Sequence, residues 1–268
     1  MKTVKLKKKK AKYEMGGSPK KSHYSIVIDE DCILLDGDKV IGVYIKIPQT
    51  ELLSLRKVAL NTKYSETYRT SSLPTKSSVF GSQPRNALRN DYCRLTINTI
   101  DEVDNFKRLL KFQDYLCSIY KKYLPNDYNN ELKWVNDNVE EDYRFSGTPY
   151  TSINVNVNHA IKYHIDKGNV KNSYSNIIIV KNNISGGELV LPDYGVALSQ
   201  CDGFMAIIKG QEVPHGVMPI KQTSGKDYYR ASIVYYTPSL IRKCLPYKEE
   251  VKRLQQIKVT RARNRAYN

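Results

Sequence analysis

The second half of the chain is a series of short strand-like runs, and this pattern limits the fold more than any other feature. Residues 151–158 alternate strictly between polar and apolar side chains, which predicts a strand with one buried face. Runs rich in β-branched and aromatic residues follow at 177–180, 188–191, 204–208 and 231–236, separated by Gly, Pro and Asn. Short strands at this spacing predict an all-β barrel or sandwich.

The first half of the chain is predicted to be mixed. Residues 23–47 hold three β-rich runs, with a strong Asp-Gly hairpin signal between two of them. Residues 62–90 are rich in Ser and Thr and broken by prolines, which favours a long loop. Apolar residues at helical spacing predict helices over 101–124 and 130–138. The fold class expected is therefore mainly β with flanking helices (α+β).

Basic residues are concentrated at the two ends of the chain. Of the net charge of +16, residues 1–22 carry +8 and residues 241–268 carry +7, which leaves +1 for residues 23–240. Basic arms of this kind usually bind polyanions, most often nucleic acid and next an anionic membrane surface. The alternative is a solvated tail that keeps the protein soluble. The first arm shows no apolar periodicity and is predicted to be disordered, whereas 248–265 has a modest helical pattern.

These patterns divide the chain into four expected parts. They are a disordered basic arm (1–22), N-terminal strands with the long loop and supporting helices (23–145), a β core (146–240) and a basic C-terminal helix or arm (241–268). Five scattered cysteines without a C-x-x-C pair argue against a disulfide framework and a zinc site, and favour a reducing compartment. The sequence shows neither a signal peptide nor an apolar run long enough to span a membrane, so we expect a soluble, intracellular protein.

Two of the four histidines lie in a pattern that suits a metal. His164 and Asp166 are separated by one residue in a strand-like region, so both side chains leave the same face. His215 follows later, directly before a glycine. Two imidazoles and one carboxylate on one side of Fe(II) leave positions for a bidentate co-substrate and O2. By itself, a His-x-Asp pair is more often a surface histidine beside a solvated aspartate.

Polar residues on the predicted strands suit a co-substrate with a carboxylate at its far end. Arg230 and Ser232 share one face of a strand, and a guanidinium fork with a hydroxyl can bind the C5 carboxylate of 2-oxoglutarate. Asn154 and Asn156 share a face with each other and could donate to 2-oxoglutarate or to a base edge. The alternative for these asparagines is an exposed polar face of a sheet.

The residues around these positions resemble a known family. The segments YHIDKGN (163–169), GGELVLP (186–192), HGVMPI (215–220) and RASIVYY (230–236) look like those of the TET/JBP-type dioxygenases, especially compact phage-encoded relatives. The resemblance extends over about 146–240, with a fainter match around residues 80–85. The large Cys-rich extensions of the animal members are absent, so no sequence preference can be carried over.

The resemblance implies a fold, a reaction and a set of site residues. The fold is a double-stranded β-helix (jelly roll), and the reaction uses Fe(II), 2-oxoglutarate and O2 to oxidise the 5-methyl group of a pyrimidine in DNA. It implies that His164, Asp166 and His215 bind iron and that Arg230 anchors 2-oxoglutarate. A phage-encoded protein would act in the host cytoplasm.

Three functions fit the sequence. The first is hydroxylation of 5-methylcytosine or thymine in DNA, with the basic arms holding the DNA. The second is the same oxidative chemistry on a protein side chain or a small molecule. The third is a nucleic-acid-binding β-barrel without activity, against which the intact set of His164, Asp166, His215 and Arg230 argues.

Overall fold

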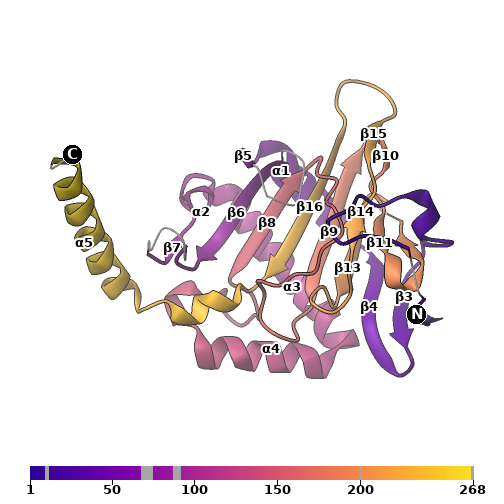
Figure 1. The fold of residues 1–268 in the computed structure, drawn as a ribbon, viewed down its shortest axis with the longest axis horizontal. Coiled ribbons are helices and arrows are strands. Elements are labelled where there is room, and N and C mark those ends of the chain that lie inside the picture. Colours follow the sequence, from indigo (N-terminus) through magenta and orange to yellow (C-terminus); the bar gives the residue numbers. More distant parts are fainter. Residues whose placement is uncertain (10–11, 68–74, 87–91, 200, 267–268) are drawn as a thin grey trace.

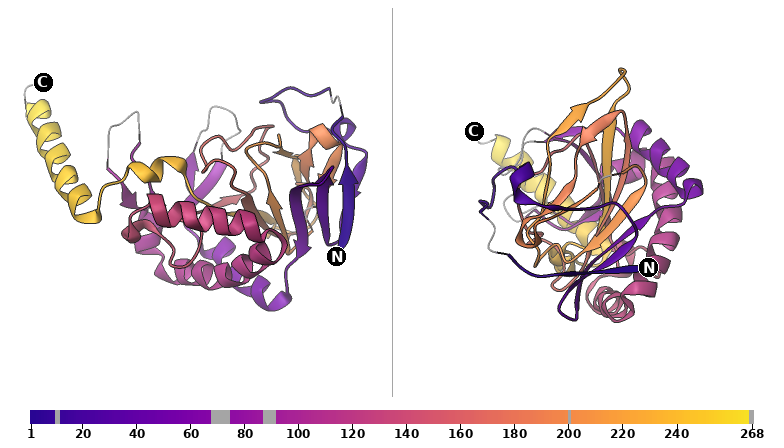
Figure 2. Two further views of the ribbon diagram at one scale, coloured as in Figure 1. Left: turned by 90° about the horizontal axis from the view of Figure 1, so that it is seen from below. Right: turned by 90° about the vertical axis from the view of Figure 1, so that its right-hand side faces the viewer.

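A mixed β-sheet lies at the centre of the structure, with helices on one face and a smaller sheet on the other (Figures 1 and 2). The structure is a computed structural model that describes residues 1–9, 12–67, 75–86, 92–199 and 201–266. Apolar side chains fill the spaces on both sides of the central sheet, so its inner strands are packed between two layers.

The central sheet has ten strands. In spatial order they are β1 (Lys2–Leu6), β3 (Cys32–Asp36), β4 (Lys39–Lys46), β13 (Phe204–Ile208), β9 (Ser175–Asn182), β16 (Tyr229–Tyr236), β8 (Ser152–Val157), β6 (Thr75–Gln83) and β5 (Ser65–Thr67), with β7 (Arg94–Leu95) beside β6. The smaller sheet has the order β14 (Gly216–Val217), β11 (Leu189–Leu191), β12 (Val196–Leu198) and β2 (Ile26–Ile28). A further pair joins β10 (Ile184–Gly186) to β15 (Ile220–Gln222).

The helices lie mainly along one face of the central sheet. They are α1 (Gln49–Asn61), α2 (Ile97–Asp101), α3 (Val103–Tyr123), α4 (Pro125–Asn138) and α5 (Tyr247–Ala266), with 3-10 turns at η1 (Lys21–His23), η2 (Glu141–Tyr143), η3 (Pro192–Tyr194) and η4 (Ser239–Lys243). α5 is different, because it projects away from the rest of the molecule (Figures 1 and 2). No helix in the described part of the chain is both long and apolar enough to cross a membrane.

The predicted strands of the second half are confirmed, and so is the fold class. Each of the five runs falls on β8, β9, β11, β13 or β16. Alternation along β16 explains how one strand serves two layers. Ala231, Ile233 and Tyr235 pack against the helices, whereas Arg230 and Ser232 face the space between the two sheets. Two facing sheets joined in this way form the double-stranded β-helix.

The predicted loop over 62–90 is wrong for its described part. Residues 65–67 and 75–83 form β5 and β6, and β6 pairs with β8 along six residues. Ser and Thr are acceptable in a strand that finds a partner, so pairing outweighed the loop-like composition. β3, β4 and β6 are hydrogen-bonded members of the central sheet, so the expected division between 23–145 and 146–240 does not follow a break in that sheet. α1 was not predicted.

The prediction of a disordered arm over 1–22 is also wrong for most of its residues. Lys2–Leu6 form β1, which pairs in parallel with β3, and Leu6 is buried. Residues 12–22 run past the smaller sheet and hydrogen-bond to the chain at Tyr163. Two of the lysines that suggested disorder, Lys2 and Lys5, lie on this exposed edge strand, where charged side chains discourage pairing with another molecule.

Two of the cysteines form a disulfide, contrary to the prediction from their spacing. Cys93 and Cys244 are 151 residues apart in sequence, and their Cα atoms lie 5.7 Å apart. Cys32, Cys117 and Cys201 are free thiols. Because the bonded pair lies on segments brought together only by the tertiary fold, no local motif could have indicated it.

The first turn of α5 is fixed to the body of the protein by one buried carboxylate. The side chain of Glu250 is 1% exposed and accepts hydrogen bonds from the backbone N–H groups of Cys93 (3.1 Å) and Leu245 (3.0 Å). It also pairs with Arg85, whose Nε lies 2.9 Å away. With the neighbouring disulfide, these bonds set the direction in which α5 leaves the molecule.

A second buried carboxylate gives the first prediction. Glu131 on α4 accepts hydrogen bonds from the Tyr120 hydroxyl and from the backbone N–H of Tyr174 (2.7 Å), and burial raises its pKa from 4.5 to about 8. The folded protein therefore holds a proton that the unfolded chain releases above pH 4.5. The stability from this group is complete below that pH and is lost as the pH rises through about 8.

We expect the free energy of unfolding to fall by about 1 kcal/mol per pH unit from this group alone between pH 5 and 8. In Glu131→Gln that contribution should disappear. Urea unfolding of both proteins at several pH values measures the difference, in which all other titrating groups cancel. Parallel curves for the two proteins would contradict the raised pKa.

Candidate metal centre

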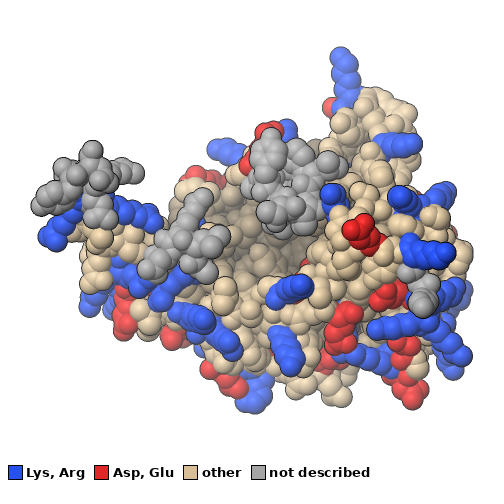
Figure 3. All heavy atoms as spheres, viewed as in Figure 1, with Lys and Arg blue, Asp and Glu red and all other residues tan. Residues whose placement is uncertain are grey.

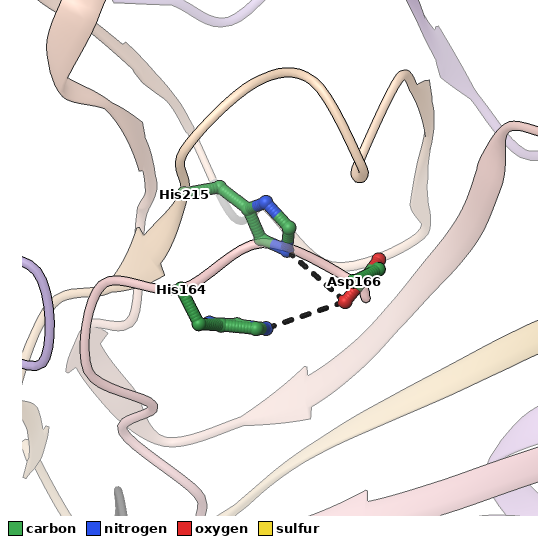
Figure 4. Close-up of side chains that lie close together, drawn as sticks. All are labelled: His164, Asp166 and His215. Atoms are coloured by element: carbon green, nitrogen blue, oxygen red, sulfur yellow. Dashed lines mark ion pairs between the residues drawn. The ribbon is translucent and has the colours of Figure 1, made fainter. Parts of the chain in front are cut away.

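His164, Asp166 and His215 come together at one end of the space between the two sheets (Figure 4). The two histidines exchange backbone hydrogen bonds of 2.9 and 3.0 Å, so a single β-bridge replaces the strand expected around His164. Oδ1 of Asp166 lies 3.4 Å from Nε2 of His164 and 3.8 Å from Nε2 of His215. One ligand atom from each residue lies within 4.8 Å of the others.

Backbone carbonyls fix the orientation of both imidazoles. Nδ1 of His164 lies 2.9 Å from the carbonyl of Lys162, and Nδ1 of His215 lies 2.9 Å from the carbonyl of Val213. Because a carbonyl can only accept, both Nδ1 atoms carry the proton, and the lone pairs of both Nε2 atoms face Asp166. This is the tautomer that a metal requires.

The carboxylate of Asp166 is fixed from its other side. Its Oδ2 accepts a hydrogen bond from the Ser175 hydroxyl, and its backbone N–H donates to the carbonyl of Gly210 (2.9 Å). A Cβ at Gly210 would lie 2.3 Å from Oδ2 and 2.4 Å from Oγ of Ser175, so only glycine leaves room for this pair. Oδ1 is left facing the two histidines.

The charge states of the three residues also suit a metal ion. Burial raises the pKa of Asp166, but the electrostatic effect of the neighbouring His215 and His164 and the hydrogen bond from the Ser175 hydroxyl outweigh it and hold that pKa well below its usual range. Burial lowers the pKa of His215. Near neutral pH Asp166 is therefore a carboxylate and burial favours the neutral form of His215, and these are the forms that bind metal. The residues fit Fe(II), for which two histidines and a carboxylate are a typical ligand set.

A cavity runs from these three residues along the inner face of the central sheet. Figure 3 shows a hollow near the middle of this face of the molecule, with Lys and Arg side chains around it. The cavity is lined by Asn154, Asn156, His159, Ile161, His164, Asp166, Asn169, Ile177, Leu189, His215, Val217, Arg230, Ser232, Val234 and Tyr236. The predicted site residues thus share one cavity, and the exposed polar face considered for Asn154 and Asn156 is excluded.

The strand register orders the cavity from apolar to polar. Val234 on β16 lies between Ile177 on β9 and Asn154 on β8. Ser232 lies two residues from Val234 along β16, in the direction away from the metal ligands. It pairs with Asn156 of β8, whose Nδ2 lies 3.5 Å from Oγ of Ser232. The metal end is fixed by Ser175, the first residue of β9, which holds Asp166.

Arg230 lies at the far, polar end of this series. Its residue is 2% exposed, and burial lowers the pKa of its guanidinium to about 10, although the nearby Glu188 acts in the opposite direction. Burying a cation in this way is costly unless an anion comes close to it. A dicarboxylate that reaches the metal with one end would place its other carboxylate near Arg230, Ser232 and Asn156.

Gly187 makes room for the Arg230 side chain. Its φ is +78°, and a Cβ there would lie 2.8 Å from Cδ and 3.0 Å from Nε of Arg230. We expect Gly187→Ala to displace the guanidinium and to raise the KM for 2-oxoglutarate by about tenfold, a loss of roughly 1.4 kcal/mol. Steady-state kinetics measures this, and Gly147→Ala, at a left-handed glycine with open space around its Cα, is the matched control. Equal KM values in the two variants would contradict the role of Gly187.

Several cavity or support residues were not predicted from the sequence. His159 is buried and lines the cavity, yet it stands in no recognisable motif. Asn169 and Tyr236 also line it, and Ser175 and Gly210 position Asp166. Asn169 and Tyr236 lie inside the segments that carried the family resemblance, so that signal could have indicated them.

The double-stranded β-helix, with two histidines and an aspartate at one end of its cavity and a buried arginine at the other, is the architecture of an Fe(II)- and 2-oxoglutarate-dependent dioxygenase. The TET/JBP family, described as the oxygenase domain of the 2OGFeDO superfamily, matches residues 78–239. The chain belongs to this family. Its members use Fe(II), 2-oxoglutarate and O2.

Curated relatives are much longer than this chain. Thymine dioxygenase JBP1 of Trypanosoma brucei brucei is 31% identical over 107 residues, which cover 40% of this chain and 12% of the relative. Thymine dioxygenase JBP1 of Leishmania major is 23% identical over 145 residues, covering 54% and 17%. The chain therefore spans less than a fifth of the length of these relatives.

A solved structure shows the same fold over nearly the whole chain. NgTET1 in complex with 5mC DNA superposes with a TM-score of 0.64 at 16% sequence identity, covering 95% of this chain and 90% of that one. At this identity the comparison establishes the fold, and the double-stranded β-helix expected from the resemblance is confirmed.

Proposed function

We propose that this protein hydroxylates the 5-methyl group of a pyrimidine, 5-methylcytosine or thymine, in DNA. The observation that carries the proposal is the single cavity with the candidate metal ligands at one end and Arg230 at the other. The JBP1 relatives are thymine dioxygenases, and NgTET1 was solved with 5mC DNA, which supports DNA as the substrate.

The residues of the cavity would divide the work. His164, Asp166 and His215 would hold Fe(II), and Arg230 with Ser232 would bind the C5 carboxylate of 2-oxoglutarate. When bound, Fe(II), 2-oxoglutarate and O2 supply the oxidation that turns a C–H bond into an alcohol while 2-oxoglutarate becomes succinate and CO2.

Two amides complete the co-substrate end of the cavity. Asn156 would add a donor from beside Ser232, to which it is already hydrogen-bonded. Asn154 lies two residues before Asn156 on β8, nearer to the candidate metal ligands, and pairs with Val234 of β16. Its buried Oδ1 accepts no hydrogen bond from the described residues. Asn154 would therefore contact 2-oxoglutarate near the metal or the edge of the substrate base.

The depth of the site requires a flipped base. His215 is 3% exposed and the metal ligands lie between two sheets, so a methyl group stacked inside a duplex could not reach them. Enzymes that act on a base inside a duplex rotate it out of the stack, at a cost of a few kcal/mol. The neutral amides lining the cavity suit a neutral heterocycle with both donors and acceptors on its edge.

The basic ends of the chain would bind the DNA backbone. On α5, Lys258, Arg261 and Arg263 are exposed, and no acidic residue follows Glu250 in the sequence. α5 projects away from the rest of the molecule, with Lys and Arg side chains along it (Figures 1 and 3). Such a surface fits phosphates without reading sequence. We also place the protein inside a cell, where DNA, Fe(II) and 2-oxoglutarate are found together.

The central experiment is anaerobic loading with Fe(II), followed by 2-oxoglutarate, air and duplexes that contain thymine alone or 5-methylcytosine. Mass spectrometry of the digested DNA is expected to show 5-hydroxymethyl bases in amounts that match the succinate released. Succinate formed only when a peptide or small molecule replaces DNA would instead support the same chemistry on that substrate. No turnover on any substrate would contradict the proposal.

The role of α5 predicts a change in salt dependence. Replacing Lys258, Arg261 and Arg263 by Gln should lower the slope of log affinity against log salt by roughly 0.9 for each DNA phosphate that is no longer neutralised. Fluorescence anisotropy with one duplex at several salt concentrations measures the slope. The matched control replaces Lys107, Lys111 and Lys121, exposed residues of α3, by Gln. Equal slopes in the two triple variants would remove α5 from the DNA-binding surface.

A further inference from the structure

The N-terminal segment from residue 12 to residue 25, which we call the strap, lies against the two chain segments that carry the histidines of the metal site. The N–H of Gly16 donates to the carbonyl of Tyr163 (2.9 Å), and the N–H of Tyr163 donates to the carbonyl of Gly17 (2.9 Å). This pair of bonds joins the strap to the residue directly before His164. In Figure 1 the indigo N-terminal trace runs past β14, which follows His215.

Side chains reinforce the attachment at Tyr163, which is 1% exposed. The ring of Tyr13 packs edge-on against the ring of Tyr163, with the two centroids 4.9 Å apart. The hydroxyl of Tyr163 lies 2.9 Å from Nδ1 of His23. The hydroxyl of Tyr13 in turn donates to Oδ1 of Asp193 (2.7 Å). Tyr163 is therefore held by the strap from two sides.

The strap also touches the residue directly after His215. A Cβ at Gly216 would lie 2.8 Å from Cγ of Pro19 and 2.9 Å from Cδ1 of Tyr163. Pro19 is buried there, so the strap, Tyr163 and Gly216 pack closely together. Since His164 and His215 are already bridged to each other, the strap supports both histidines from the side away from the cavity.

We propose that the strap is a positioning element of the metal site, which holds the two imidazoles at the spacing that the metal requires. This inference rests on the proposed metal role of His164, Asp166 and His215. Residues that fix ligand orientation typically change metal affinity by about 10–100-fold when they are removed. Linkage adds a second consequence, because a strap that strengthens metal binding must itself be stabilised by the metal to the same degree.

The test uses Co(II) as the probe and the full-length chain. Gly16→Pro removes the N–H that bonds to Tyr163 and cannot adopt the φ of +80° found at Gly16. We expect it to bind Co(II) about tenfold more weakly than the wild type, as measured by titration of the visible absorption. Gly225→Pro is the matched control, since Gly225 also has a left-handed φ (+65°) but lies in an exposed turn. Its affinity should stay within about twofold of the wild type.

Two Tyr→Phe variants test the strap without the risk that the proline variant fails to fold. Tyr163→Phe removes the hydroxyl that bonds to His23, whereas Tyr143→Phe, at an equally buried tyrosine that contacts no strap residue in the bonds described, removes a hydroxyl that donates to the carbonyl of Leu245 (3.1 Å). Only Tyr163→Phe should weaken Co(II) binding, and Co(II) should slow hydrogen exchange of residues 12–25 in the wild type. Unchanged affinity in both strap variants would overturn the strap proposal and leave the metal site standing. A wild type that binds no Co(II) would overturn the metal site itself.

Discussion

The Asp166→Asn protein is expected to bind Fe(II) at least roughly 100-fold more weakly than the wild type and to release no measurable succinate. The substitution keeps the shape of the side chain but removes the only negative charge among the three candidate ligands. Removing a group that merely orients a ligand already costs about 10–100-fold in affinity. Losing the charged ligand itself must cost more, because Oδ1 faces both imidazoles at 3.4 and 3.8 Å.

A graded series separates the charge of Asp166 from its orientation. Ser175→Ala removes the hydrogen bond to Oδ2 while the carboxylate stays, so we expect a loss of about 10–100-fold. Ser173→Ala, at a buried serine of the same segment, is the control and should bind metal as the wild type does. Titration with Co(II) gives the affinities without turnover. Wild-type affinity in Asp166→Asn would show that the metal, if any, is held elsewhere.

The sequence predicted those site residues whose position in the cavity depends on their spacing along a strand. His164 and Asp166 are two residues apart, as are Arg230 and Ser232, and each pair does face one cavity. Side chains two residues apart in an extended segment point to the same side, and this depends only on the local backbone. It therefore holds even though the strand expected around His164 is only a single bridge. The roles of these residues toward iron and 2-oxoglutarate stay predictions until binding is measured.

Features that depend on contacts between distant segments could not be predicted from the sequence. Ser175 and Gly210 hold Asp166 only because β9 and the end of β13 meet beside it, and neither residue has a local signature. The strand β1 is another example, since a lysine-rich segment alone favours disorder until β3 offers it an edge. The Cys93–Cys244 bond likewise joins parts of the chain that only the tertiary structure brings together.

Replacing Arg230 by Gln is expected to raise the KM for 2-oxoglutarate by roughly 100-fold or more, because breaking a buried pair of charges typically costs about 3–5 kcal/mol. The residue is 2% exposed and fixed from behind by Gly187, so water cannot replace the guanidinium. Arg230→Lys keeps the charge but loses the planar fork, and it should fall between the wild type and Arg230→Gln. At saturating 2-oxoglutarate, kcat should change much less than KM in both variants.

Thermal unfolding provides a test of Arg230 that does not depend on turnover. In the Co(II)-loaded wild type, 2-oxoglutarate at about 100 times its Kd should stabilise the folded state by about 2.7 kcal/mol, which raises the unfolding midpoint. The same concentration should stabilise Arg230→Gln by no more than about 0.4 kcal/mol, because it then lies near or below the Kd of that variant. Arg56→Gln, at a half-exposed arginine paired with Asp202 on the helical side, should respond as the wild type does. A full shift in Arg230→Gln would mean that the far carboxylate of 2-oxoglutarate is bound by a different group.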